Sequence, residues 1–212
     1  MTRSTLLVLP VSLCLLAVGG CAPIAWLGQA LIPEPQSTIE PEFADLEGHS
    51  VAVVIYADRE VLYEYPRAVT DLSELIGGQL AQNVKNCRVL DGRGIIHFQD
   101  ATLDWDAMEK TELGKKFGAD YVLYVALSTF TMHEGGSDYL CRGEIIADVS
   151  IHKTAMPERQ SRVFAVHSFR VVHPPEAQPA DSDAVVRAVQ AFAETEFATR
   201  LVKKFYKHQV PK

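Results

Sequence analysis

The chain has little positive charge for its length of 212 residues. Its 20 lysine and arginine residues stand against 27 aspartate and glutamate residues, which gives a formal net charge of −7. A nucleic-acid-binding domain needs a basic patch that neutralises phosphate groups, so this balance argues against a nucleic-acid partner. It also argues against binding to an anionic membrane surface through basic side chains alone.

The sequence also lacks the short motifs that mark common enzymes. A GxSxG motif is absent, and the nearest segment, Gly135–Asp138, is typical of a hairpin turn. His133 and Glu134 begin like an HExxH motif, but no second histidine follows. His133, Glu134 and Asp138 are candidate metal ligands, because they could converge in one loop. We therefore expect no catalytic residues, no cofactor-binding residues and no enzymatic activity, with a metal-dependent enzyme as the least favoured alternative.

Cysteine is scarce, with four residues in the chain. Cys14 and Cys21 belong to an N-terminal apolar segment, which leaves Cys87 and Cys141 elsewhere. No CxxC spacing or histidine cluster accompanies this pair, so it does not predict a metal site. The strands expected below place the two thiols at opposite ends. We expect both to be buried and free, with a disulfide as the alternative in an oxidising compartment.

What the chain does contain is a short apolar segment at its amino terminus. Residues 6–20 follow Arg3, are interrupted by Pro10 and end directly before Cys21. A basic start, a short apolar core and small residues before a cleavage site predict a secretory signal peptide over residues 1–20. Because crossing a bilayer takes about 20 residues, a retained membrane anchor is a less favoured alternative.

A cysteine directly after the small residues makes this segment resemble the lipobox of bacterial lipoprotein signal peptides. The resemblance implies cleavage before Cys21, which then becomes the first residue and carries a diacylglycerol and an acyl chain such as palmitate. Cleaved export without a lipid is the alternative. Ala22 follows the cysteine, whereas aspartate there would signal inner-membrane retention in bacteria with Lol-type sorting. The implied location is the outer membrane, facing the periplasm, with the inner membrane as the alternative.

The remaining chain divides into a spacer and one globular domain. Residues 21–47 hold the lipidated cysteine and a proline-rich segment, which predicts an extended, semi-rigid tether. Residues 48–208 have the apolar content and the ordinary charged fraction of a globular protein, and their number suits a single domain. The prolines of the tether are Pro23, Pro33, Pro35 and Pro41.

Hydrophobic spacing predicts an α/β (α+β) fold in which helices pack on a single mixed β-sheet. Residues 50–57 form a continuous apolar run, typical of a central strand buried on both faces. Residues 142–153 alternate between apolar and polar side chains, as a half-exposed antiparallel strand does. The order is β-α-β-α-β-β-β-α, with loops or turns at 58–66, 91–94 and 174–179. The expected elements in chain order are 50–57, 67–85, 87–90, 106–117, 119–131, 142–153, 162–172 and 182–206.

The segment from Leu113 to Val125, LGKKFGADYVLYV, contains a helix end, Gly-Ala-Asp and a strand. It resembles the junction shared by the curli-secretion lipoprotein CsgG, the penicillin-binding-protein activator LpoB and the amino-terminal domain of TolB, and by uncharacterised envelope lipoproteins with the same sheet. The resemblance covers residues 48–206 and implies a binding module, from which no catalytic residue is carried over. We expect neither the membrane-inserted hairpins of a CsgG-like pore nor the β-propeller that follows in TolB.

These observations predict a non-enzymatic lipoprotein that binds or scaffolds another component of the cell envelope. Its expected partners are the membrane, through the lipid on Cys21, and an envelope protein or further copies of the chain. An oligomeric secretion-channel component is the second hypothesis. An enzyme with a metal ion held by His133, Glu134 and Asp138 is the third.

Overall fold

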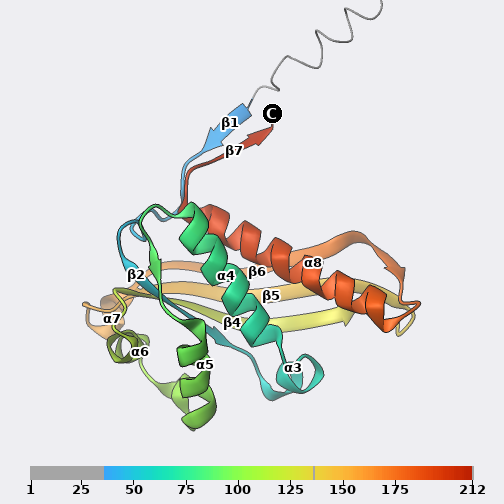
Figure 1. The fold of residues 1–212 in the computed structure, drawn as a ribbon, viewed down its shortest axis with the longest axis horizontal. Helices are drawn as coiled ribbons and strands as arrows, with labels where there is room; N and C mark the ends of the chain where they lie inside the picture. Colours follow the sequence, from blue (N-terminus) through green and yellow to red (C-terminus); the bar gives the residue numbers. More distant parts are fainter. Residues whose placement is uncertain (1–35, 136, 212) are drawn as a thin grey trace, which may run out of the picture. The chain divides into compact units, whose positions relative to one another are not determined.

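The computed structural model describes residues 36–135 and 137–211, and Figure 1 shows their arrangement. The predicted signal peptide, the lipidation site Cys21 and the first part of the predicted tether lie outside these residues. The described chain divides into two compact units. One unit is Glu40–His208, and the other consists of residues 36–39 and 209–211.

The smaller unit is built on a two-stranded sheet formed by β1 (Gln36–Ile39) and β7 (His208–Pro211). The hydrophobic spacing predicted a single sheet, and this second sheet makes that prediction incomplete. Strands of four residues are too short to show the alternation of apolar and polar side chains that identifies a strand. β1 also lies in the segment whose prolines indicated a tether.

The larger unit contains a five-stranded mixed sheet in the order β3-β2-β4-β5-β6. β2 runs parallel to β3 on one side and to β4 on the other, and β4, β5 and β6 form an antiparallel meander. The predicted mixed sheet with helices packed on it is therefore confirmed. The strands are β2 (Ser50–Tyr56), β3 (Arg88–Val89), β4 (Tyr121–His133), β5 (Leu140–Lys153) and β6 (Arg162–Pro179).

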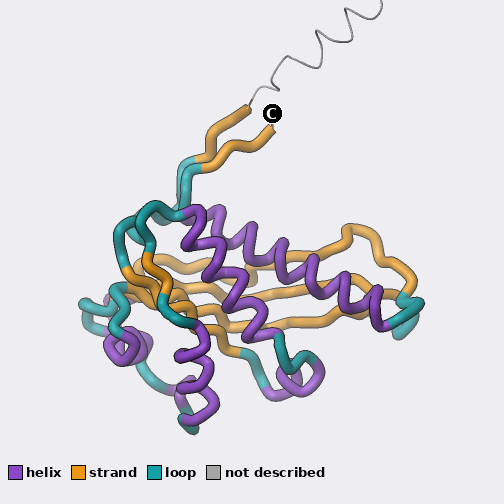
Figure 2. Tube along the Cα trace, in the orientation of Figure 1, coloured by secondary structure: helices purple, strands orange, loops and turns teal. Residues whose placement is uncertain are grey.

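Helices cover both faces of this sheet, as Figure 2 shows. α4 (Ala68–Asn83) and α8 (Asp183–Val202) lie against each other on one face. α5 (Gly92–Ala101) and α6 (Lys110–Phe117) pack on the other face, over β2 and β4. Their apolar spacing predicted α4, α6 and α8, whereas α5 was not predicted.

β2 is buried on both faces because it lies between these two helix layers. Val51, Val53 and Ile55 belong to the core beneath α4 and α8, whereas Ala52 and Val54 belong to the smaller core beneath α5 and α6. None of the five is more than 3% exposed. The continuous apolar run that predicted a central strand arises because alternate side chains enter two different cores.

Three segments predicted as loops or turns are regular structure. Asp58 caps α3 (Arg59–Glu64), its Oδ1 accepting from Val61 N at 2.9 Å, and Asp91 Oδ1 caps α5 by accepting from Arg93 N at 3.1 Å. Aspartate is common both in turns and at helix N-caps, so an aspartate alone does not show which of these structures follows it. β6 also continues through the proline-rich segment, which is tolerated because β6 is the outermost strand of its sheet.

The start of α6 also differs from its prediction. The helix was predicted over residues 106–117, but Trp105–Ala107 form the short 3-10 helix η1 and α6 starts at Lys110. The predicted end is confirmed, because Gly118 closes the helix in the left-handed conformation, with a φ of 69°. Two further short helices are α7 (Glu158–Ser161) and η2 (Lys203–Phe205), which directly follows α8.

Residues 40–47, which were predicted to belong to the tether, form part of the larger unit. Leu46 is fully buried in the larger core. Glu42 and Phe43 donate their N–H groups to the carbonyl oxygen of Lys204, at 2.7 and 3.2 Å. Lys204 Nζ in turn lies 2.7 Å from Glu42 Oε1. The start of this unit is therefore bonded to its C-terminal end.

The Gly-Ala-Asp junction has a structural role. Asp120 Oδ2 accepts hydrogen bonds from Ser50 N at 2.8 Å and from Ser50 Oγ at 2.6 Å. The N–H of Asp120 donates to Ser50 Oγ at 2.9 Å. The bonds that Asp120 accepts hold the pKa of its carboxyl below the usual range. The junction therefore aligns the start of β4 with the start of β2, which accounts for the aspartate without a binding role.

Asp120→Ala is expected to lower the free energy of unfolding by about 2 kcal/mol, because the buried N–H of Ser50 loses its side-chain acceptor. Asp120→Asn should cost less, since an amide oxygen can still accept. Urea denaturation followed by circular dichroism measures both variants. Glu112→Ala removes an exposed carboxylate from α6 and is the control. An equal decrease in the free energy of unfolding for Asp120→Ala and Glu112→Ala would contradict the role of Asp120 in aligning the two strands.

Candidate functional site

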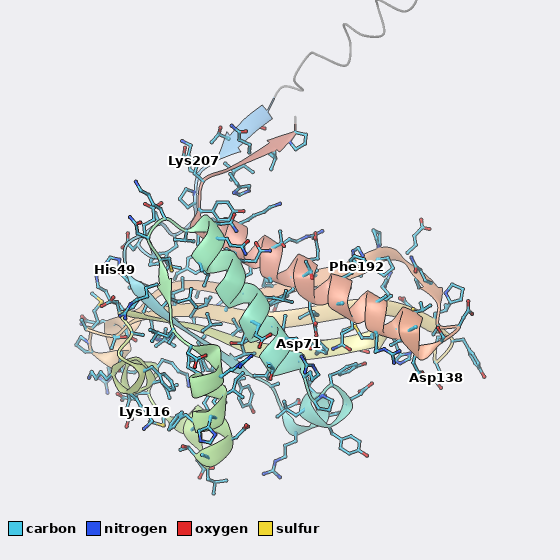
Figure 3. All side chains as sticks on the ribbon, in the orientation of Figure 1. His49, Asp71, Lys116, Asp138, Phe192 and Lys207 are labelled. Carbon is cyan, nitrogen blue, oxygen red and sulfur yellow. The ribbon has the colours of Figure 1, made fainter. Side chains whose placement is uncertain are left out.

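An open groove between α8 and the start of α4 is the candidate functional site. We call it the α4–α8 groove, and its volume is about 500 Å³. Figure 3 labels Asp71, which lies near the N-terminal end of α4 and lines the groove. The other residues from this side are Glu64, Tyr65, Pro66 and Arg67. The residues from α8 are Arg187, Gln190, Ala191 and Glu194, which recur at helical spacing and so share one face.

The wall formed by α8 is held in place by close packing. Where α8 crosses Gly143 of β5, a Cβ atom on the glycine would lie only 2.6 Å from Ala193 Cβ. Ala193 and Phe197 are fully buried in the core. Gln79 Nε2 of α4 donates a hydrogen bond to Thr199 Oγ1 of α8 at 3.3 Å, which joins the two helices beyond the groove.

The opposite wall is held by Tyr65, which is 7% exposed. Its hydroxyl oxygen accepts a hydrogen bond from Met132 N at 3.1 Å. Its ring centroid lies 4.9 Å from that of Phe130, so the side chain is fixed against β4. Burial raises the pKa of this phenol, so it stays protonated well above neutral pH, as an ordinary phenol also does at neutral pH. Both walls of the groove are thus packed on the same sheet.

Glu194 is the unusual residue of the groove. It is only 4% exposed, and its partner is the neutral amide of Gln190, whose Nε2 donates to Oε1 at 2.9 Å. Burial raises the pKa of the carboxyl to about 7; Asp71 adds to the rise, while the Gln190 bond and Arg67 oppose it. Acidic side chains are almost never buried without a cation. A buried acid with a strongly shifted pKa in a cleft is a candidate functional residue.

Charged side chains of both signs surround the mouth of the groove. Arg67 binds Asp71 with two hydrogen bonds, Nη2 to Oδ1 at 2.7 Å and Nε to Oδ2 at 3.3 Å. Glu64 and Arg187 are exposed. The groove therefore places one buried carboxyl group inside a rim where one of the two arginines already has a partner. Such a site can bind a cation or exchange a proton near neutral pH.

A second, smaller crevice of about 280 Å³ lies at the C-terminal end of β2. The chain leaves β2 for β3 on one side and returns to β4 on the other, and ligands of α/β sheets often bind where such connections diverge. Gln99 Nε2 donates to the Ile55 carbonyl oxygen at 2.9 Å, and Trp105 lines the opening. None of its lining residues is a buried ionisable group, so the α4–α8 groove is the stronger candidate.

His152 stands at the centre of a buried polar network. Its Nδ1 lies 2.9 Å from Ser161 Oγ and its Nε2 3.1 Å from Ser150 Oγ. Glu158 Oε1 lies 3.9 Å from Nδ1, while Glu158 Oε2 accepts from the N–H and hydroxyl of Thr111. Serine, histidine and acid recur in hydrolases, but here the bonds connect β5, α6 and α7. Burial lowers the pKa of His152, and we interpret the network as structural.

The candidate metal ligands His133, Glu134 and Asp138 are not brought together. Glu134 instead binds Arg142, with Nε 2.7 Å from Oε2 and Nη2 3.0 Å from Oε1. Asp138, labelled in Figure 3, lies at the exposed tip between β4 and β5. Over residues 36–135 and 137–211, no three His, Cys, Asp or Glu side chains form a group that could hold a metal ion.

Cys87 and Cys141 are free thiols, as predicted. Cys141 is fully buried, whereas Cys87 is half-buried, and burial raises the pKa of the Cys87 thiol. A raised pKa disfavours the reactive thiolate of Cys87, and full burial keeps Cys141 away from solvent and substrates. Cys21 lies outside the described residues. Within the part of the chain that the structure describes, no helix is long and apolar enough to cross a bilayer.

Neither a protein family nor a curated protein matches the chain. Among solved structures it is similar to the PelC dodecamer from Paraburkholderia phytofirmans, with 10% identity over 81% of this chain and 98% of that chain and a TM-score of 0.45. It is also similar to lipoprotein GNA1162 from Neisseria meningitidis, with 12% identity, coverage of 71% and 98%, and a TM-score of 0.39. Uncharacterized lipoprotein B from Nitrosomonas europaea shows 8% identity, coverage of 77% and 84%, and a TM-score of 0.33.

Two of these three neighbours are named as lipoproteins. Identities and TM-scores this low define neither a shared family nor a shared function. None of the three is named as a CsgG, LpoB or TolB protein, so that specific resemblance stays a prediction.

Proposed function

We propose that the chain is a lipoprotein anchored to the outer membrane, facing the periplasm, that works by binding another component of the cell envelope without catalysing a reaction. The observation that carries the proposal is the apolar segment that follows Arg3 and ends in Gly19-Gly20-Cys21. A single acyl chain holds a protein only marginally, whereas two or more give stable anchoring. A diacylglycerol with a further acyl chain on Cys21 meets that requirement.

The binding role is supported by the α4–α8 groove. Its walls are packed and therefore preformed, and it holds the buried carboxyl of Glu194. Among the residues that the structure describes, no lysine, arginine or histidine forms an ion pair with this carboxyl, which is hydrogen-bonded by the amide of Gln190. Sites with convergent polar groups and perturbed pKa values are the usual places where ligands bind. In this proposal, the lipid holds the domain at the membrane and the groove determines which partner the domain binds there.

Cys21→Ser tests the anchor. The variant is expected to move from the membrane fraction to the soluble fraction and to lose labelling by an alkyne analogue of palmitate, because serine has no thiol for the lipid. Cys87→Ser, which changes a half-buried thiol in the globular unit, is the control and should stay membrane-bound. Fractionation with in-gel fluorescence measures both. A Cys21→Ser chain that still sediments with membranes and still carries the label would refute the anchor.

Two further measurements address the finer parts of the proposal. Ala22→Asp should shift the chain from outer-membrane to inner-membrane fractions on a sucrose gradient if sorting reads this position. Crosslinking of whole cells followed by affinity purification should recover an envelope protein with the intact chain. Recovery of no protein above the level of an untagged strain would count against the binding role.

A further inference from the structure

We propose that the α4–α8 groove receives a lysine or arginine side chain of a partner protein, and that Glu194 forms the ion pair with it. This inference rests on the proposed function as a binding module and names the chemistry of the partner. It is carried by the shape of the groove, by the bonding of Glu194 and by the charges around it.

The groove has the two zones that such a side chain needs. Its apolar lining includes Tyr65, Pro66 and Ala191, against which a hydrocarbon stem can pack. Tyr65 and Glu194 are buried, whereas Pro66, Ala191 and Arg187 are exposed, so the carboxyl group lies deeper than the rim. Lysine and arginine combine an apolar stem with a charged tip, which matches this arrangement.

The carboxyl group of Glu194 has bonding capacity left over. An ionised carboxylate has two oxygens and about four acceptor positions. Within residues 36–135 and 137–211, the one hydrogen bond to it is donated by Gln190 to Oε1. A protein cation would occupy the remaining positions and supply the charge that a buried carboxylate lacks.

The neighbouring charges favour a cation over an anion. Around Glu194 stand Glu64 of α3, Asp71 of α4, Arg67 at the start of α4 and Arg187 of α8. Arg67 is already bound by Asp71 through two hydrogen bonds. Arg67 and Asp71 neutralise each other, which leaves the two acids Glu64 and Glu194 against Arg187 alone.

A glutamine at this position would have the same shape and would still accept from Gln190. It would also avoid the cost of burying an ionisable group, which a purely structural role does not require. The presence of glutamate rather than glutamine therefore points to its charge as the feature that matters.

Binding of a cation changes the pKa of Glu194 in one expected direction. A positive charge beside a carboxylate favours the ionised form, so it lowers the pKa of Glu194 from its value of about 7. Binding at pH 6 must release a proton, whereas binding at pH 8 releases almost none. The affinity for a cation should therefore weaken as the pH falls below 7.

The experiment uses the full-length chain in a mild detergent, labelled with carbon-13 at the glutamate carboxyl groups and followed by NMR. The probe is N-acetyl-lysine methylamide at about 20 mM, above the millimolar dissociation constant expected for a single side chain. The Glu194 signal is identified by its absence in Glu194→Gln. Its titration midpoint should fall by about one unit or more with the probe. N-acetyl-norleucine methylamide, which has a similar stem but no charge, should leave it in place.

Two variants test whether the probe acts in the groove or elsewhere on the surface. Ala191→Phe should block the groove and abolish the shift while leaving Glu194 itself unchanged. Glu196→Gln changes another glutamate of α8, which is paired with Arg200, and should leave the effect of the probe intact. An unchanged Glu194 midpoint, or an equal effect of the norleucine probe, would overturn the inference. Membrane release of Cys21→Ser is measured separately, so failure of the anchor and failure of the groove are distinguishable.

Discussion

Gly143→Ala is expected to lower the free energy of unfolding by about 2–3 kcal/mol, although it adds a single methyl group. The new Cβ atom would lie 2.6 Å from Ala193 Cβ, 3.1 Å from the His173 carbonyl oxygen and 3.2 Å from Met132 Sδ. The two nearest atoms belong to a helix methyl group and to the backbone, neither of which has a flexible end that could move aside. α8 would have to lift from β5, which would also widen the α4–α8 groove.

Gly78→Ala is the matched control for this prediction. It adds the same methyl group to α4 at a position where nothing lies within 4 Å of the new atom. Alanine is a better helix former than glycine by about 1 kcal/mol, so this variant should be stabilised rather than destabilised. Urea unfolding of both variants gives the comparison. Gly143→Ala with the stability of the parent chain would show that α8 does not approach β5 as closely as described.

Glu194→Gln is expected to stabilise the protein by about 2 kcal/mol at pH 8 and to have little effect at pH 4. The carboxyl has a pKa of about 7 in the folded chain, against 4.5 for an ordinary glutamate. Between pH 4.5 and 7 the folded state holds a proton on Glu194 that the unfolded state has released. The stability that protonated Glu194 contributes is therefore complete below pH 4.5 and is lost as the pH rises through 7. The full rise in the pKa of Glu194 corresponds to about 3 kcal/mol of folding free energy. We expect an effect of about 2 kcal/mol because water in the open groove screens the charge.

The measurement is the free energy of unfolding of both chains at several pH values. Burial lowers the pKa of His152, so protonation of this group destabilises the fold as the pH falls below about 6.5, opposite in direction to Glu194. The difference between the parent chain and Glu194→Gln removes this contribution, because His152 is present in both. Glu196→Gln is the control for loss of a glutamate from α8. Parallel pH curves for the parent and Glu194→Gln would contradict the raised pKa.

The strength of the apolar patterns decided how much of the fold could be predicted. Residues 50–57 are apolar throughout because β2 faces two cores, and residues 142–153 alternate because β5 faces one. α3 and α5 were missed because Asp58 and Asp91 act as helix caps at positions where aspartate equally predicts a turn. The β1–β7 pair was missed because strands this short carry no pattern.

The candidate site was harder to predict than the fold. Glu194 stands three, four and seven residues before Phe197, Ala198 and Leu201, all of which are fully buried. That spacing puts a glutamate on the apolar face of a helix, and it is a signal that the sequence contains. The depth of its burial also depends on α4, which is distant in sequence. In the same way, Glu134 could look like a metal ligand because its bond with Arg142 depends on the pairing of β4 with β5.

The attachment of Glu42 and Phe43 to Lys204 has a mechanical consequence. Tension in the chain ahead of β1 reaches first the pairing of β1 with β7 and the ion pair between Glu40 and Lys207. It then reaches the two hydrogen bonds to the Lys204 carbonyl oxygen and the ion pair between Glu42 and Lys204. Lys204 lies in η2, directly after α8, the helix that carries Glu194. Under the proposed function, a load on the chain ahead of β1 is therefore passed to α8, so one helix would carry both that load and the contact with the partner.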